Sequence, residues 1–140
     1  MPQIDDLSSV SIDALKDIQN WQSRYRTITQ WGTLITPKPD LRIEDNLVRG
    51  CEVNAWLTCE AQLSGEFIFF FDSESRVING LGVLVLSQIQ GKDKTNIEVL
   101  DWVAIFSELG LSKHLTPSRS NGLREVVNRV YLLVGLPKPF

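Results

Sequence analysis

Two cysteines, Cys51 and Cys59, carry the most nucleophilic side chains of this 140-residue chain, and no Cys-x-x-Cys pair is present. On one extended strand, two residues at this spacing would lie about 26 Å apart, at ~3.3 Å per residue. The pair therefore predicts neither a local disulfide nor a zinc site. The chain has one histidine, His114, whereas most metal sites and catalytic triads need further partners. We expect no metal and no cofactor, which leaves a single thiol as the candidate reactive group.

Cys51 is the better placed of the two thiols because it directly follows Gly50. Glycine permits an unusual turn and a close approach by another backbone. A loop tip can also present a thiol to the site of a partner, whereas a cysteine within a sheet cannot. A free cysteine is more often a small buried hydrophobe, and from these residues alone inert packing is the favoured interpretation. For Cys59, inside an expected strand, we predict inert packing.

The composition is that of one globular domain, residues 1–140, with 43% hydrophobic and 22% charged residues. A net charge of -3 argues against a general nucleic-acid binder. No segment has the roughly 20 apolar residues that cross a bilayer. The N-terminus, Met1–Asp6, lacks the basic and apolar regions of a secretion signal. We therefore expect a cytoplasmic protein, in a reducing compartment, with neither nucleic acid nor membrane as a partner.

The expected elements before the middle of the chain are helices, followed by one β-hairpin. Ser11 is a helix cap, and apolar residues recur after it at spacings of three and four. Asn20 is a second candidate cap, so this segment is either one long helix or two. Residues 53–61 and 66–71 predict strands, joined through a turn at Ser64-Gly65.

Three helices are expected after the hairpin, which makes the chain an α+β domain with helices packed around a small antiparallel sheet. The first begins at Ser73 or Ser75, and the second at a capping box formed by Thr95–Glu98. Asp101 is able to restart this second helix, and Gly110 is its expected end. The third begins around Pro117 and is closed by Gly135 and Pro137.

Three segments, in order along the chain, resemble motifs of the SufE family of sulfur acceptors. The first, Arg49–Leu57, resembles its Gly-Cys…Trp motif, and the second, Phe71–Val77, is followed by Gly80-Leu81. The third, His114–Leu123, contains a distinctive Ser-Arg-Ser-x-Gly-Leu core. Trp21 and Tyr25 fit an aromatic pair in the family's early helix. Within the family, Glu52, Asp72–Glu74 and Phe106–Leu111 resemble the CsdE branch.

This resemblance implies a helical domain around a small antiparallel sheet, similar in shape to the IscU-type iron–sulfur scaffolds. It also implies that Cys51 accepts a persulfide sulfur from a cysteine desulfurase, a pyridoxal-phosphate enzyme of the CsdA or SufS type. The sulfur would then pass to a downstream acceptor protein, toward iron–sulfur cluster or related assembly. The protein would stimulate the desulfurase and would act as an accessory carrier rather than as an enzyme.

The resemblance and the charges together assign roles to further residues. Arg119 is the candidate for stabilising the Cys51 thiolate and lowering its pKa, with the nearby helix N-terminus as a second source of positive potential. The alternative for Arg119 is an ordinary surface arginine at a helix start. A partner-binding surface is expected at Gly50, Glu52, Asp72 and Glu74, although Asp72 could instead cap the following helix.

Other classes of protein also use a reactive thiol. An iron–sulfur scaffold would share the fold but typically needs three cysteines, and this chain has two. A thiol redox sensor would also use one reactive cysteine, yet Cys59 is badly placed as its resolving partner. A plain interaction module with an inert Cys51 is the third alternative.

Overall fold

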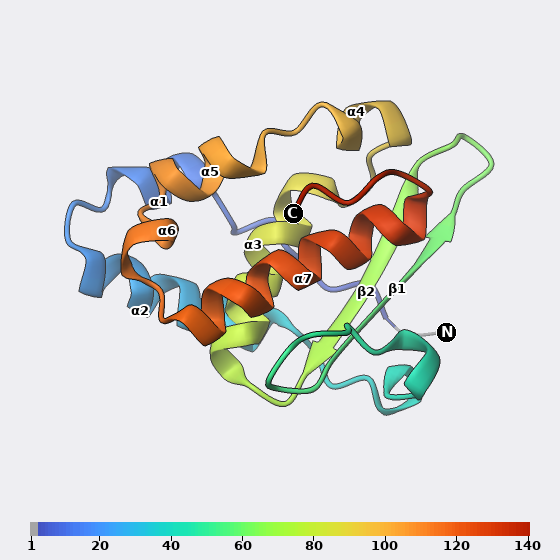
Figure 1. Cartoon of the computed structure of the whole chain (residues 1–140), viewed down its shortest axis with the longest axis horizontal. Coiled ribbons are helices and arrows are strands. Elements are labelled where there is room, and N and C mark those ends of the chain that lie inside the picture. The colour runs from blue at the N-terminus through green and yellow to red at the C-terminus, as the bar shows by residue number, and fades with distance from the viewer. Residues whose placement is uncertain (1–2) are drawn as a thin grey trace.

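The computed structural model describes residues 3–140, so Met1 and Pro2, which belong to the segment considered above for a secretion signal, lie outside the described residues. The described part is an α+β domain, as the sequence predicts (Figure 1). Three short 3-10 helices, Gly32–Leu34, Pro39–Leu41 and Glu44–Asn46, connect the second helix to the hairpin. The helices and strands are α1 (Ile12–Asp17), α2 (Trp21–Trp31), β1 (Ala55–Ala61), β2 (Phe67–Ser73), α3 (Arg76–Ile89), α4 (Lys94–Glu98), α5 (Trp102–Glu108), α6 (Leu111–His114) and α7 (Pro117–Val134).

Short polar side chains start most of these helices. The Ser11 hydroxyl accepts from the Ala14 N–H, and the Asn20 amide oxygen accepts from the Ser23 N–H, so the first segment forms two helices. Ser75, rather than Ser73, caps α3. These side chains satisfy backbone N–H groups that a helix start would otherwise leave without a partner.

The helices between α3 and α7 differ from the expectation. The capping box at Thr95–Glu98 is wrong, because Asp93 caps α4 and its carboxylate accepts from the Asn96 N–H at 2.9 Å. Asp101 does start a new helix, α5. Gly110, with a positive φ of 75°, ends α5 and at the same time precedes α6, a short helix that the sequence did not predict.

The two strands form an antiparallel pair in which Ala55 lies opposite Ser73 and Cys59 opposite Phe69. The second strand therefore extends two residues beyond the predicted 66–71, which places Asp72 and Ser73 in the sheet. The outer edge of β2 is bonded to a side chain. Gln90 accepts from the Phe69 N–H at 2.7 Å and donates to the Phe69 carbonyl at 3.0 Å.

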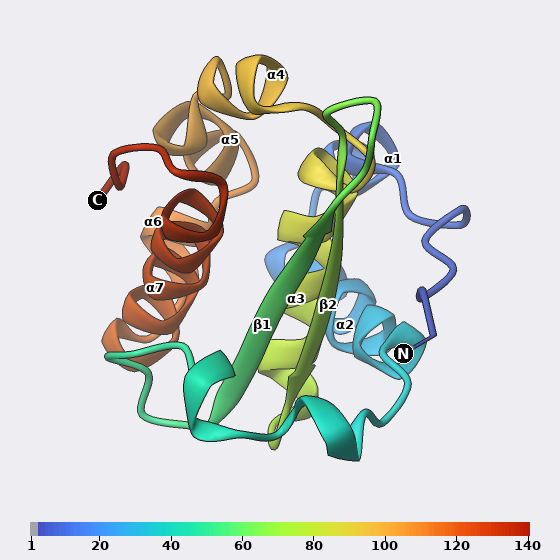
Figure 2. The same ribbon diagram turned by 90° about the vertical axis from the view of Figure 1, so that its right-hand side faces the viewer.

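Helix α3 is the centre of the core and is buried on almost every side. It packs against the sheet, with α2 beyond it, while α7 lies alongside β1 (Figure 2). Gly80 allows the close approach of α2 and α3, since a Cβ there would lie 2.0 Å from the Ile28 carbonyl oxygen. The sheet and α3 thus form a fixed base on which the Cys51 loop and α7 are positioned.

A buried ion pair ties the N-terminal segment to the sheet. The Lys38 ammonium donates to Asp5 at 2.6 Å and to the Phe71 carbonyl at 2.9 Å, and the side chains of the pair are 2% and 3% exposed. Asp5 also accepts from the backbone and the hydroxyl of Thr36. These bonds fix the two-proline segment that follows α2 beside β2.

Candidate functional site

Cys51 lies in the loop between the Arg49-Gly50 turn and β1, beside the first third of α7. Gly50 has a φ of +86°, a conformation that favours glycine. The Asn121 amide donates to the Gly50 carbonyl at 2.7 Å, and the Cys51 thiol donates to the Gly122 carbonyl at 3.6 Å. The sequence expectation that the start of the last helix packs beside the cysteine is therefore confirmed.

A pocket of about 320 Å³ opens at the thiol. Three segments far apart in the sequence meet there: the cysteine loop, the start of α3 and the first turns of α7. The wall combines apolar groups with hydroxyls and one guanidinium. Its residues are Cys51, Glu52, Val53, Ser75, Ile78, Thr116, Ser118, Arg119 and Gly122.

The thiol in this pocket is held in its neutral form. Burial raises the pKa of Cys51 to about 11, and the negative charge of Glu125 adds to the effect. Glu125 lies directly behind the turn, since a Cβ on Gly50 would come within 3.1–3.2 Å of its side chain. The expected lowering of the Cys51 pKa is therefore wrong for the free protein.

Arg119 lines the same pocket as the thiol, and its guanidinium is engaged with α2. Its guanidinium carbon lies over the Tyr25 ring, 5.7 Å from the ring centroid. The pKa of Cys51 follows from burial and from Glu125, and Arg119 is not among its causes. The role of thiolate stabiliser that we expected for Arg119 stays a prediction; in this structure Arg119 joins the start of α7 to α2.

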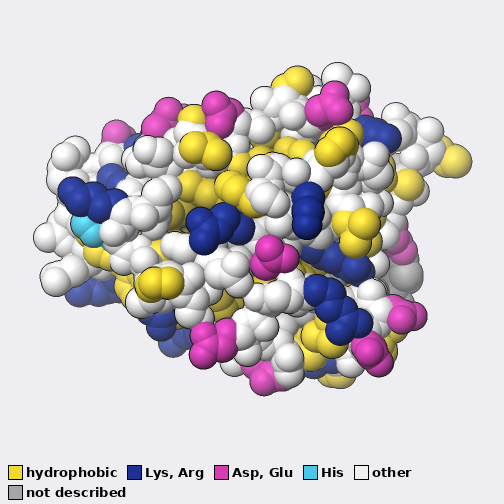
Figure 3. Space-filling view, in the orientation of Figure 1, with side chains coloured by type: hydrophobic (Ala, Val, Ile, Leu, Met, Phe, Trp, Pro, Cys, Tyr) yellow, Lys and Arg dark blue, Asp and Glu magenta, His cyan; other side chains and the backbone are white. Residues whose placement is uncertain are grey.

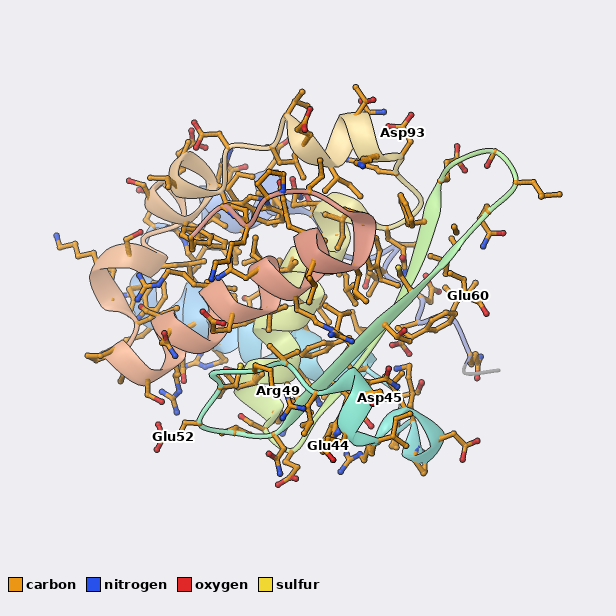
Figure 4. The ribbon with its side chains drawn as sticks, turned by 45° about the vertical axis from the view of Figure 1, so that its right-hand side comes forward. Glu44, Asp45, Arg49, Glu52, Glu60 and Asp93 are labelled. Atoms are coloured by element: carbon orange, nitrogen blue, oxygen red, sulfur yellow. The ribbon has the colours of Figure 1, made fainter. Side chains whose placement is uncertain are left out.

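Gly50, Glu52 and Glu74 are exposed around the thiol, as a partner surface requires. The Ser118 hydroxyl donates to the Glu52 carboxylate, which ties the loop to the first turn of α7. Figure 4 shows Glu52 at the outer end of the loop, pointing away from the body of the protein. The Asn54 amide donates to Glu74 at 2.9 Å, across the base of the same loop.

Asp72 does not belong to this surface, which corrects its expected part in partner binding. It is 2% exposed, and its carboxylate accepts from the Lys38 N–H at 2.9 Å and from Arg42 Nε at 3.0 Å. It does not cap α3 either, because Ser75 does. Its carboxylate fixes the connection between α2 and β1 against the end of β2.

Sequence reasoning missed Glu125 and Asn121, which act on the loop from α7. Asn121 lies inside the third motif, and Glu125 follows Gly122 by three positions, so both face the loop from adjacent turns. The helical spacing from the motif was the signal that could have identified Glu125.

Cys59 stands apart from this site, in β1. Burial raises its pKa, with the charge of Arg129 opposing the shift. Within residues 3–140, the structure has no group of three or more His, Cys, Asp or Glu side chains arranged to hold a metal ion. Nor is any helix in this part of the chain long and apolar enough to cross a membrane.

The fold and the loop thiol together describe a class of small α+β domains. Comparisons with known proteins assign this chain to that class. Residues 10–134 match the SufE family, described as an Fe-S metabolism associated domain. The chain belongs to the SufE family, which confirms the resemblance carried by the three motifs.

Individual relatives agree with this membership. The chain is 35% identical over 116 residues to an uncharacterised SufE-like protein of Haemophilus influenzae, covering 82% of this chain and 92% of the relative. It is 34% identical over 107 residues to the sulfur acceptor protein CsdE of Escherichia coli, covering 76% and 73%. A hypothetical protein from Thermus thermophilus, solved in solution, has the same fold, with a TM-score of 0.72, 15% identity, and coverage of 95% and 96%.

Proposed function

We propose that this protein accepts a sulfur atom as a persulfide on Cys51 from a cysteine desulfurase and passes it to a downstream acceptor protein. The single observation that carries the proposal is the position of Cys51, a thiol on a tight loop that lines an open pocket. Membership of the SufE family and the likeness to a sulfur acceptor protein support it. In this role the protein is an accessory carrier that stimulates the desulfurase.

The transfer is a thiol–persulfide exchange. The Cys51 thiolate attacks the outer sulfur of the persulfide on the desulfurase cysteine, and a new S–S bond forms at Cys51. The S–S bond on the desulfurase breaks, and its cysteine leaves as a thiolate that takes up the proton given up by Cys51. No external oxidant or reductant is needed. The pyridoxal phosphate that generates the first persulfide belongs to the desulfurase.

Activation of Cys51 occurs in the complex rather than in the free protein. With a pKa of about 11, only about one thiol in ten thousand is ionised at pH 7. The partner must therefore lower this pKa, through its own charges or by drawing the thiol away from Glu125. Gly50, Glu52 and Glu74 form the rim through which we expect the desulfurase to make contact.

Intact mass measurement after incubation with a cysteine desulfurase and free cysteine tests the proposal. The wild-type protein should gain one or more sulfur atoms, and a reductant should remove them. Cys51→Ser should show no gain and no stimulation of the desulfurase, whereas Cys59→Ser should retain both. Sulfur uptake by the Cys51→Ser variant, or its loss in Cys59→Ser alone, would contradict the proposal.

The raised pKa also separates this function from that of a redox sensor. A sensor thiol reacts with peroxide through its thiolate, so sensors use cysteines of low pKa that solvent can reach. The environment of Cys51 favours the opposite protonation state. An iron–sulfur scaffold remains disfavoured by the presence of two cysteines in the chain.

A further inference from the structure

A second hollow lies along α7, adjoining the thiol pocket but separate from it. We call it the α7 groove. Its volume is about 390 Å³. Glu125 connects the two sites, since it lines the groove and also contacts the Gly50 turn from behind. The groove has three leucines, Leu47, Leu132 and Leu136, and three cations, Arg49, Arg129 and Lys138.

The cations give this face a charge opposite to that of the whole protein, whose net charge is -3. Figure 3 shows lysine and arginine side chains gathered on the face that α7 presents, with acidic groups more scattered among them. Arg129 donates to two backbone carbonyls, of Leu57 and Asp45, which orient its guanidinium without neutralising the charge. Arg49 pairs with Glu44 at 3.6 Å, but both side chains are at least 70% exposed. Such an exposed pair contributes little and is easily exchanged for another partner.

The leucines give the groove an apolar lining. Leu132 is 68% exposed, although it lies in the last turn of the long helix α7. One exposed leucine is ordinary. Here, however, it borders the same hollow as Leu47 and Leu136, so that one aliphatic side chain from outside would find three apolar neighbours.

We infer that the α7 groove binds an acidic segment of a partner protein, with an aliphatic side chain seated among the leucines and flanking Asp or Glu residues against Arg49, Arg129 and Lys138. Charge complementarity favours an acidic ligand, and the leucines favour a peptide over a purely anionic ligand such as nucleic acid. The identity of the partner, a protein that exchanges sulfur with Cys51, rests on the proposed function. Arg49 directly precedes Gly50 and Cys51, so a segment in the groove would hold its parent protein at the thiol.

The test uses the full-length protein and a blocked peptide, acetyl-Asp-Glu-Leu-Asp-Glu-amide, in an NMR titration. The methyl groups of Leu132 and Leu136 should shift, and the double variant Leu132→Ser/Lys138→Glu should bind about tenfold more weakly. The matched control changes another exposed aliphatic residue and another exposed lysine, as Val103→Ser/Lys113→Glu, and should bind like the wild type. A peptide with serine in place of leucine should bind the wild-type protein about tenfold more weakly than the parent peptide does, or weaker still. A peptide with lysine in place of each acidic residue should show a loss of the same size or larger.

Three results would overturn the inference. They are no binding of the parent peptide, equal binding of the serine peptide, and equal losses in the groove variant and the matched control. None of them involves sulfur, so the mass measurement on Cys51 remains an independent test. A wild-type protein that binds the peptide but takes up no sulfur would contradict the proposed function and leave the groove as a binding site.

Discussion

The Cys51 sulfur lies 3.6 Å from the Gly122 carbonyl oxygen, and its proton is directed at the first third of α7. This bond requires the neutral thiol, because a thiolate has no proton to donate. The bond and the raised pKa of Cys51 therefore describe one state, in which the free protein keeps its cysteine protonated against the helix.

We expect Cys51 to react slowly with iodoacetamide at neutral pH. A cysteine with the ordinary pKa of 9.0 is only about 1% ionised at pH 7, whereas burial raises the pKa of Cys51 to about 11. The alkylation rate of Cys51, followed by peptide mass spectrometry, should still be rising at pH 10. A rate that is half-maximal near pH 9 and has levelled off by about pH 10 would show that the thiol is not shielded in solution.

Glu125→Gln should speed this alkylation, because it removes the negative charge that helps to raise the Cys51 pKa and keeps nearly the same shape. The midpoint of the pH profile should move to lower pH, while remaining above that of an exposed cysteine, since burial is the larger cause. Glu98→Gln, an exposed change on α4, is the control and should leave the profile in place. Equal profiles for Glu125→Gln and the wild type would remove Glu125 from the site.

Arg119→Ala should leave the pH profile of Cys51 alkylation unchanged in the free protein. The guanidinium lies over Tyr25 and is not among the groups that shift the Cys51 pKa. The same alkylation series measures it. A profile displaced to higher pH in the variant would mean that Arg119 does stabilise the thiolate, as the sequence had suggested.

The protonated state of Cys51 also predicts how stability depends on pH. The folded-state pKa of about 11 exceeds the ordinary cysteine value of 9.0, so between these values the folded protein binds more protons than the unfolded one. The free energy of unfolding should therefore fall as the pH rises from about 9 to 11. Urea unfolding of the wild type and Cys51→Ser should show a steeper fall for the wild type. Parallel curves would contradict the shift.

The buried pair of Asp5 and Lys38 should make the N-terminal segment important for stability. Asp5→Ala leaves the Lys38 ammonium buried without its counter-charge, which costs about 3–5 kcal/mol in the free energy of unfolding. Lys38→Met added to this variant should recover much of the loss. Asp6→Ala, a change at an exposed neighbour, is the control and should leave the urea unfolding curve close to that of the wild type.

The sequence predicted those parts of the fold that depend on local rules. Ser11, Asn20 and Asp101 start helices because each is a short polar residue just before a run of helix-compatible residues. The same rule failed at Thr95, because Asp93 two positions earlier satisfies it equally well. The motifs also located the thiol and the helix beside it.

Properties that depend on distant residues could not be predicted in this way. Asp72 is adjacent to a helix in the sequence, yet its partners Lys38 and Arg42 come from a connection 34 and 30 residues away. The pKa of Cys51 likewise depends on how deeply α7 covers it, which no spacing in the sequence reports. The motif and its charge suggested Arg119 as a neighbour of the thiol, whereas the contact of Glu125 with the Gly50 turn depends on packing that the sequence does not report.

The bonds between Gln90 and Phe69 have a consequence for the behaviour of the protein at high concentration. An open strand edge offers free peptide groups on which a strand of another molecule can assemble, and such pairing starts aggregation. The Gln90 amide imitates a peptide group in both its donor and its acceptor, so it occupies the middle of the β2 edge as a neighbouring strand would. Together with the Gly91 and Lys92 backbone at Phe67 and the Lys38 ammonium at the Phe71 carbonyl, this side chain closes the β2 edge, which protects a strand as apolar as Phe67–Phe71 from edge-to-edge pairing between molecules.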